Sequence, residues 1–241
     1  MKRFNWINVK LIVMFALVIF LYSFTSRRNE QRKVLPPVVE FLDGDNLFVT
    51  REAVNKLLIQ NSDSPLSIAK DKLDLNKLEH TLESQDMIQH AEVFIGIDGA
   101  LKAVVKQKTP VARVFEGGDS FYVDYEGGRM PLSEYYTARV PLVSGEINEK
   151  NNVGLNKLFK FIYEDEFLQK NIIGIQVLPN GGVKMMNRNY NYEIDFGKTV
   201  NIERKFDNYK AFFQKAVQDS SINNYKKVNL KFTQQVVCTK N

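Results

Sequence analysis

The chain has 241 residues, a formal net charge of +5 at pH 7 and one cysteine. This length is enough for one large or two small domains beside any membrane anchor. The basic residues are spread along the sequence, which argues against a nucleic-acid-binding protein, and a single cysteine excludes an intramolecular disulfide.

The first recognisable element is an uncharged run from Leu11 to Phe24. Extended by a few residues, it approaches the roughly 17–20 residues that span a bilayer, so we expect a transmembrane anchor. A cleavable signal peptide is the competing interpretation, but residues 23–26 are a poor cleavage site. Basic residues flank the run on both sides, so charge does not decide the topology. The shortness of residues 1–10 mildly favours a cytoplasmic N-terminal tail.

A polar, basic linker is predicted over residues 25–37, followed by a short apolar strand over residues 38–42. Thr50 is a suitable N-cap for a first helix, and Asp74 is a suitable N-cap for a second. The polar residues 61–72 between them are predicted to form a loop.

A β-hairpin is predicted around Asp98 and Gly99, because apolar residues alternate with polar ones on both sides of this turn. A plain two-residue turn would place Ile95 opposite Lys102 and mix apolar with charged side chains on one face. We therefore expect an odd-length loop or a bulge at residues 98–100, which Gly99 permits. The expected pairs are Ile97 with Leu101, Ile95 with Ala103, Val93 with Val105, Glu92 with Lys106 and Phe94 with Val104.

Residues 38–107 thus have the order β-α-α-β-β, which predicts a small α+β module with a three-stranded sheet and two helices on one face. After Pro110 the pattern changes to short strands separated by glycine-containing turns. Helices are expected over residues 153–169 and from the N-cap Asn201. Residues 108–241 are therefore predicted to form an antiparallel β domain packed by two helices. Its expected strands are 111–115, 121–125, 140–143, 172–178, 183–186, 192–196, 227–232 and 235–238.

The sequence contains no recognisable catalytic, cofactor-binding or metal-binding pattern. His80 and His90 have no cysteine or carboxylate at metal-ligand spacing, so structural roles are expected. Cys238 could suggest a sortase-like thiol enzyme, but such a nucleophile needs a histidine, and no histidine follows His90. We expect Cys238 to be a small apolar filler.

The order of anchor, basic linker, β-α-α-β-β module and β-rich domain resembles the FtsQ/DivIB family of bacterial cell-division proteins. The stretches that carry the resemblance are AEVFIGIDGALKAVVKQKTPVARV at 91–114, FYVDYEGGRMPLS at 121–133 and KKVNLKF at 226–232. The first is similar to the family's passage from its POTRA module into the β domain, and Arg113 stands where the family has an arginine. Asp124 and Gly127 match the family's aspartate-then-glycine hairpin. Asn229 departs from the pattern, since many relatives carry an aspartate there.

The resemblance implies a non-enzymatic, single-pass scaffold of the division machinery, with its N-terminus in the cytoplasm and its bulk outside the inner membrane at the septum. The POTRA module would contribute to localisation. The C-terminal domain would hold the FtsB–FtsL coiled-coil pair by adding a partner strand to a sheet edge, where lysines would suit an acidic segment. No cofactor, nucleic acid or small-molecule substrate is implied. The expected partner-binding residues are Lys227, Val228, Asn229, Leu230, Lys231 and Phe232.

Two other classes of protein remain as alternatives. A POTRA-containing translocation or outer-membrane assembly factor shares the first module. It should carry a long C-terminal transmembrane barrel, which the two predicted helices of the second domain disfavour. A sortase-like envelope enzyme or wall hydrolase would need a constellation of histidine, cysteine and glutamate that the sequence does not provide.

Overall fold

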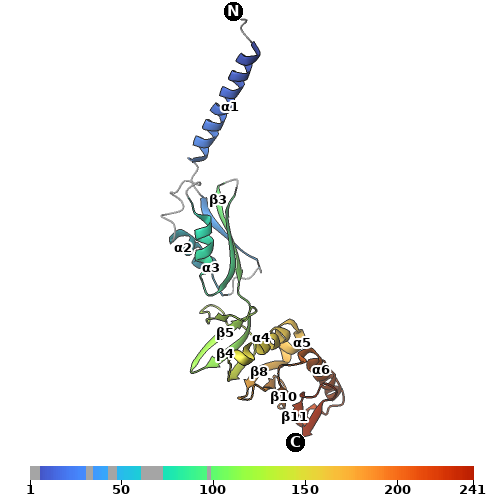
Figure 1. Ribbon diagram of the computed structural model, residues 1–241. Coiled ribbons are helices and arrows are strands. Elements are labelled where there is room, and N and C mark those ends of the chain that lie inside the picture. The colour runs from blue at the N-terminus through green and yellow to red at the C-terminus, as the bar shows by residue number, and fades with distance from the viewer. Residues whose placement is uncertain (1–5, 31–34, 43–47, 61–72, 97–98) are drawn as a thin grey trace, which may run out of the picture. The chain divides into compact units, whose positions relative to one another are not determined.

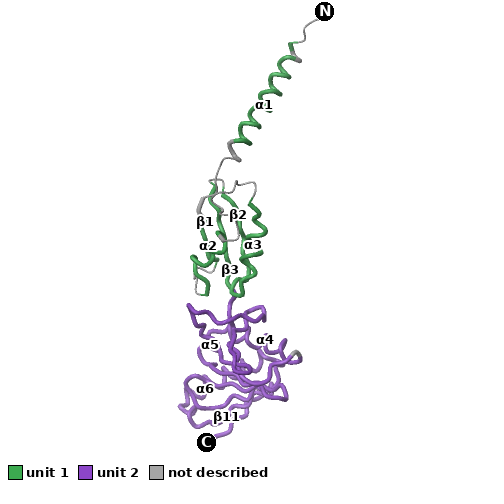
Figure 2. Tube along the Cα trace, turned by 90° about the vertical axis from the view of Figure 1, so that its left-hand side faces the viewer, with its two compact units in different colours: residues 1–107 green, residues 108–241 purple. Residues whose placement is uncertain are grey.

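The computed structural model describes residues 6–30, 35–42, 48–60, 73–96 and 99–241. The described residues form the helices and strands of an α+β protein (Figure 1). The chain divides into two compact units, which are coloured separately in Figure 2. Unit 1 comprises residues 1–107, and unit 2 comprises residues 108–241.

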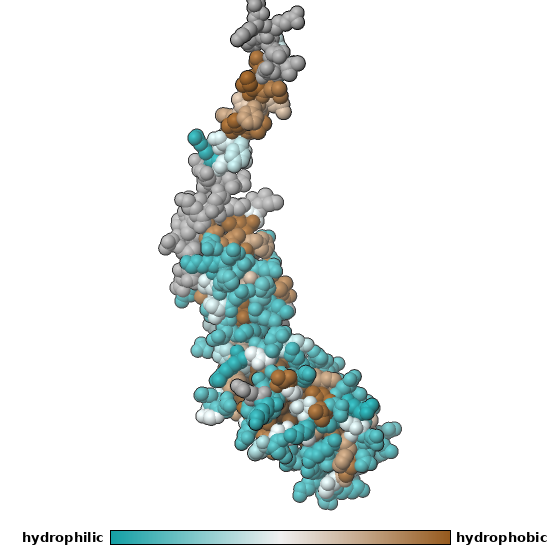
Figure 3. Space-filling view, viewed as in Figure 1, coloured by the Kyte–Doolittle hydropathy of each residue, from teal (hydrophilic) through white to brown (hydrophobic). Residues whose placement is uncertain are grey.

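Helix α1 (Trp6–Glu30) contains the uncharged run of the sequence. Among the described residues it is the one helix whose length and composition suffice to cross a membrane, over Val9–Arg27. Its described middle part is apolar and appears brown in Figure 3. The helix is longer than the anchor predicted at 11–24, because no glycine or proline interrupts residues 25–30 of the predicted linker.

Unit 1 carries, after α1, the predicted order β-α-α-β-β. Its elements are β1 (Leu35–Phe41), α2 (Arg51–Gln60), α3 (Leu75–Glu83), β2 (Ile88–Ile95) and β3 (Ala100–Gln107). In the described part of the unit the strands form one sheet in the order β1-β3-β2, with β1 parallel and β2 antiparallel to β3. The first strand begins before the predicted Val38, because Leu35 already pairs with Ala100.

Helices α2 and α3 begin where the sequence predicts. Thr50 Oγ1 accepts a hydrogen bond from Ala53 N at 3.1 Å, and Asp74 Oδ1 accepts one from Lys77 N at 3.0 Å. Each cap satisfies an amide that the first turn of a helix leaves unpaired. The core between helices and sheet contains the buried side chains of Val54, Leu58, Leu78, Leu82, Val93, Leu101, Ala103 and Val105.

Gln107, at the end of β3, ties the segment before α2 to the sheet. Its Oε1 accepts hydrogen bonds from Phe48 N at 2.9 Å and from Val49 N at 3.0 Å. All three residues are buried. These two bonds therefore connect distant parts of the sequence within the interior of unit 1.

The β2–β3 hairpin lies where the sequence predicts, but its predicted register is wrong. The apolar side chains share one face as expected, while every pair is shifted by two residues. Such a shift keeps each side chain on its face, so the alternation of apolar residues could not distinguish the two registers. The observed pairs are Ile95 with Leu101, Phe94 with Lys102, Val93 with Ala103, Glu92 with Val104 and Ala91 with Val105.

The loop of this hairpin explains the shift. Gly96 N donates to Ala100 O at 2.8 Å, and Gly99 N donates to Gly96 O at 3.0 Å. Gly99 has φ of +88°, a conformation that glycine adopts without steric cost. The loop therefore closes at Gly96, earlier than predicted. Ile97, which was expected opposite Leu101, lies outside the described residues.

Unit 2 contains a nine-stranded sheet and three α-helices within residues 108–241, all of which the structure describes. Its strands are β4 (Pro110–Glu116), β5 (Asp119–Asp124), β6 (Arg129–Met130), β7 (Leu142–Gly145), β8 (Ile172–Val177), β9 (Val183–Asn187), β10 (Glu193–Gly197), β11 (Tyr225–Asn229) and β12 (Val237–Lys240). Its helices are α4 (Glu149–Glu164), α5 (Glu166–Asn171), α6 (Ile202–Gln218) and the short 3-10 turn η2 (Ile222–Asn224). The strand order is β12-β11-β10-β9-β8-β7-β4-β5-β6.

The sheet of unit 2 is mixed, whereas the sequence predicted an antiparallel one. The pairs β4–β7, β7–β8 and β10–β11 are parallel. Parallel neighbours need crossover connections. Helices α4 and α5 provide the crossover between β7 and β8, and α6 provides the one between β10 and β11.

Two helices of unit 2 differ in detail from the predictions. The helix predicted at 153–169 is two helices that meet at Asp165, which has an extended backbone and accepts a hydrogen bond from Leu168 N at 2.9 Å. Asp165 therefore ends α4 and caps α5. Asn201 precedes α6 as predicted, but its backbone is left-handed, with φ of +51°, and its side chain makes no capping bond within the described unit.

One face of the sheet carries the core of unit 2. Phe206 of α6 is fully buried, with its ring centroid 5.0 Å from that of Phe196 and 5.5 Å from that of Phe161. Residues paired across neighbouring strands share a face, and one line of such pairs belongs to the same apolar cluster as α4 and α6. The line consists of Val114, Val143, Ile175, Met185, Ile194, Val228 and Cys238. The helices therefore cover this face, and Cys238 continues it onto β12.

Candidate partner-binding edge

The residues predicted to bind a partner lie on β11 and directly after it. Strand β11 pairs with β10 on one side and with β12 on the other. Strand β12 therefore covers the outer side of Lys227–Asn229, so the edge strand of the sheet is β12 and not β11. Strand β11 is also shorter than predicted, since it ends at Asn229. Val228 and Leu230 are buried in the core and have no surface to offer a partner.

Asn229 is the last residue of β11, and its side chain forms a hydrogen bond with the turn that follows. Its Oδ1 accepts a hydrogen bond from Lys231 N at 3.0 Å, a local bond that asparagine commonly forms in turns. Leu230 N donates to Asp195 O at 2.9 Å, one residue after the end of the strand. The polar contact of Asn229 is thus made within the chain.

The lysines of this region gather around a buried carboxylate. Asp195 Oδ2 lies 2.8 Å from Nζ of both Lys227 and Lys231. Burial opposes the ionisation of Asp195, but the hydrogen bonds from the two lysines outweigh it and lower the pKa of the carboxyl. The hydrogen bond to Asp195 in turn raises the pKa of Lys227. These lysines alternate with the core residue Val228, so they lie on the face opposite the helices.

Strand β12 stands at the end of the sheet. Asn241 N donates to Asn224 O at 2.9 Å, and alternate residues of a strand direct their amides to the same side. The N–H of Thr239 therefore faces β11, while those of Cys238 and Lys240 face away from the sheet. No described residue accepts a hydrogen bond from either of these outward amides. Strand β12 thus presents the unpaired backbone groups that a further strand requires.

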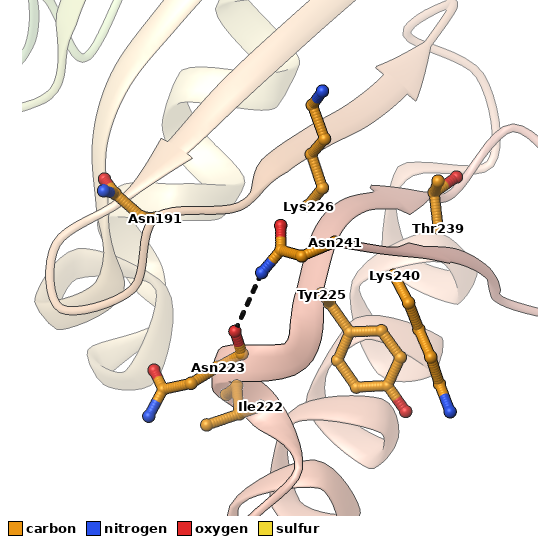
Figure 4. A pocket seen from close by; sticks show the side chains of 8 residues that line it. All are labelled: Asn191, Ile222, Asn223, Tyr225, Lys226, Thr239, Lys240 and Asn241. Atoms are coloured by element: carbon orange, nitrogen blue, oxygen red, sulfur yellow. Dashed lines mark hydrogen bonds between the residues drawn. The ribbon is translucent and has the colours of Figure 1, made fainter.

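A polar hollow of about 700 Å³ lies at one end of β12 (Figure 4). Asn241 Nδ2 donates to Asn223 O at 3.1 Å beside it. Tyr225 and Lys240 are paired residues of β11 and β12, and their side chains both line the hollow. Lys226 lines the hollow too. Among the described residues, neither Lys226 nor Lys240 forms an ion pair, whereas Lys227 and Lys231 both do. The hollow therefore combines two cationic side chains with backbone and amide groups.

The chemistry of this edge is that of hydrogen bonding. Burial raises the pKa of the Cys238 thiol, which is the opposite of what a thiolate nucleophile needs. His90 belongs to unit 1, where its Nδ1 lies 2.6 Å from Glu83 Oε1. Among the described residues, no group of three or more histidine, cysteine, aspartate and glutamate side chains is placed to hold a metal ion.

A signal for the true edge was present in the sequence. The segment 235–238 was predicted as a strand, and it follows β11 after a short connection. Consecutive strands with short connections usually pair with each other in antiparallel fashion. Applied to β11 and β12, this rule places β12 on the outer side of Lys227–Asn229, as the structure does.

Two family models match the chain. A model described as FtsQ/DivIB, C-terminal related, matches residues 109–239, which is more than half of the 241 residues. A model described as a POTRA-like domain matches residues 43–106. No curated protein matches the chain. The two family matches fall in unit 2 and unit 1, respectively.

Proposed function

The chain belongs to the FtsQ/DivIB family of non-enzymatic bacterial division scaffolds, and we propose that it binds its partner by adding a strand to β12. The observation that carries this proposal is the uncovered outer side of β12, with the amides of Cys238 and Lys240 directed away from the sheet. In strand addition, backbone hydrogen bonds supply affinity and alternate side chains supply selectivity. An added strand would also extend the apolar face that reaches β12 at Cys238.

We propose as partner an FtsB/FtsL-like coiled-coil pair that presents an acidic extended segment. Lys226 and Lys240 lie at one end of the edge. At the other end, where Val237 pairs with Asn229, the residues that follow β11 leave Phe232 about half exposed, at 51%. Charge complementarity of this kind accelerates association and selects among partners. Of the residues predicted from the sequence, Lys227, Lys231 and Phe232 thus remain proposed contacts, while Val228 and Leu230 support the edge from inside.

Helix α1 and the family together fit a single-pass membrane division protein. We propose that the N-terminus lies in the cytoplasm and that both units lie on the outer side of the inner membrane, at the division septum. A reporter enzyme that is active only outside the cytoplasm, fused after Asn241, is expected to be active. Activity of the same reporter fused before Met1 instead would contradict this orientation.

The decisive experiment replaces an outward amide of β12. Cys238→Pro removes an N–H that faces away from β11, so the pairing with β11 is retained while an added strand loses a donor. The full chain in detergent is co-expressed with FtsB-like and FtsL-like proteins of the same organism. We expect Cys238→Pro to weaken their association by about tenfold or more, while Cys238→Ala leaves it unchanged. Equal association of both variants, with unchanged circular dichroism, would contradict strand addition at β12.

A further inference from the structure

The β2 edge of unit 1 is occupied by side chains of its own helix. Val93 N donates to Glu79 Oε1 at 2.8 Å, and Ala91 N donates to Glu83 Oε1 at 3.4 Å. Ala91 and Val93 are two residues apart, so their amides point to the same side of the strand. The intervening residue Glu92 directs its amide to the other side, toward β3, which also pairs with β2. The two carboxylates thus take the positions that carbonyl groups of a neighbouring strand would take.

The spacing of helix and strand makes this double contact possible. Residues four apart on a helix lie on one face, about 6.0 Å apart along the axis. Residues two apart on a strand lie about 6.6 Å apart. Helix α3 and strand β2 run in opposite directions here, since Glu79 meets Val93 and Glu83 meets Ala91. Two carboxylates of α3 therefore match two outward amides of β2.

His90 holds the second carboxylate in place. Its Nδ1 lies 2.6 Å from Glu83 Oε1, the oxygen that accepts from Ala91 N. The hydrogen bond from His90 is the main reason why the pKa of Glu83 is lowered, with the Ala91 amide as the next cause. Hydrogen bonds with an ionised acceptor are roughly twice as strong as neutral ones. Glu83 is therefore fixed by its surroundings and stays ionised at neutral pH.

We propose that Glu79 and Glu83 form a latch that closes the β2 edge of unit 1 to strand pairing. An incoming strand needs the same two amides that the carboxylates occupy, and it would have to displace both charged acceptors. An edge without this latch would pair with the same edge of a second copy, because its unpaired N–H and C=O groups can form hydrogen bonds with those of another exposed strand. This inference is independent of the partner proposed for β12, since it concerns only the described contacts between α3 and β2.

The test compares the full chain in detergent with Glu79→Ala/Glu83→Ala and with Glu79→Gln/Glu83→Gln, which keeps a side-chain carbonyl acceptor. We expect the alanine pair to accelerate amide exchange of Val93 and Ala91 by about tenfold or more, the equivalent of losing a hydrogen bond to a charged group. The amides of Glu92 and Phe94, which face β3, serve as internal controls and should change little. The glutamine pair should keep most of the protection.

Self-association is the second measurement. Light scattering should give a larger protein mass for the alanine pair than for the wild type, while the glutamine pair should match the wild type. The comparison with the wild type removes any association at β12, since that edge is the same in all three proteins. The latch is overturned if the exchange of Val93 is the same in all three. It is equally overturned if the alanine pair keeps the wild-type mass.

Discussion

In unit 1 the outward amides of β2 are bonded to two carboxylates of α3, whereas in unit 2 the outward amides of β12 have no acceptor among the described residues. The other two edge strands, β1 and β6, are protected against pairing in different ways. Strand β1 contains Pro36 and Pro37, which have no amide hydrogen, and β6 consists of only two residues. Charged side chains, prolines and short strands are the usual protections of an edge. This difference supports the proposal that β12 is the edge that pairs with a partner strand.

The largest effect is expected from removing a buried ring of the core of unit 2. Phe206→Ala deletes a fully buried ring that packs against Phe196 of β10, and it should lower the free energy of unfolding of unit 2 by about 3–5 kcal/mol. Urea unfolding of the full chain in detergent, followed by amide exchange in each unit, measures this loss. Phe232→Ala, at a ring that is 51% exposed, should change the stability by less than about 0.5 kcal/mol. Similar losses for both variants would show that the core is not where the structure places it.

The corresponding substitution in unit 1 is at Gln107, which lies on β3 and not on the edge strand β2. Gln107→Ala removes two buried hydrogen bonds, from Phe48 N and Val49 N, and should destabilise unit 1 by about 2 kcal/mol. Gln89→Ala, at an exposed position of β2, is the matched control and should have little effect. Amide exchange of unit 1 separates the two. The role of Gln107 would be refuted by equal protection in both variants.

A smaller effect is expected at the buried carboxylate of Asp195 on β10. Asp195→Asn weakens two ion pairs with partly exposed lysines, Lys227 and Lys231, so the loss should be about 1 kcal/mol. Because the pKa of Asp195 is lowered in the folded protein, its stabilisation is complete above the usual aspartate pKa of about 3.9. It is lost as the pH falls through the lowered value. Urea midpoints measured against pH should therefore converge for the two proteins at acidic pH, and a constant gap would contradict the ion pairs.

The smallest effect is expected from titrating the carboxylate of Glu83. The pKa of Glu83 is lowered chiefly by its hydrogen bond with His90, so its contribution is complete above the usual glutamate pKa of about 4.3. It is lost as the pH falls through the lowered value. Amide exchange of Ala91, corrected for the intrinsic rate, should accelerate over this range in the wild type. Glu83→Gln should show no such change with pH, and a parallel change in both would exclude Glu83 as its source.

The features that the sequence predicted correctly depend on residues close together in the chain. Thr50 and Asp74 cap their helices because each needs an amide only three residues away. The β-α-α-β-β order, the α+β class and the presence of an apolar helix are equally local properties of pattern and composition. Each of these was confirmed by the structure or by the family matches.

The errors concern relations between distant residues. The alternation of apolar and polar residues determines which face of the sheet Val93 lies on, but not which residue of β3 lies opposite it. Two registers that differ by two residues place every side chain on the same face. Likewise, the lysines after Tyr225 look like an edge until β12 is placed beside them. Glu79 and Glu83 were overlooked, although their spacing of four puts both on one helix face. The groups that they bind, the outward amides of Ala91 and Val93, can be recognised only once the position of α3 beside β2 is known.

The match between the repeats of α3 and β2 also constrains the lengths of two short segments, residues 79–83 and residues 91–93. One residue inserted between Glu79 and Glu83 would rotate the second carboxylate by about 100° around the helix, away from its amide. One residue inserted between Ala91 and Val93 would turn one of the amides toward β3 instead. Residues 79–83 and residues 91–93 are therefore each expected to keep their length among relatives that share the latch, without insertions or deletions.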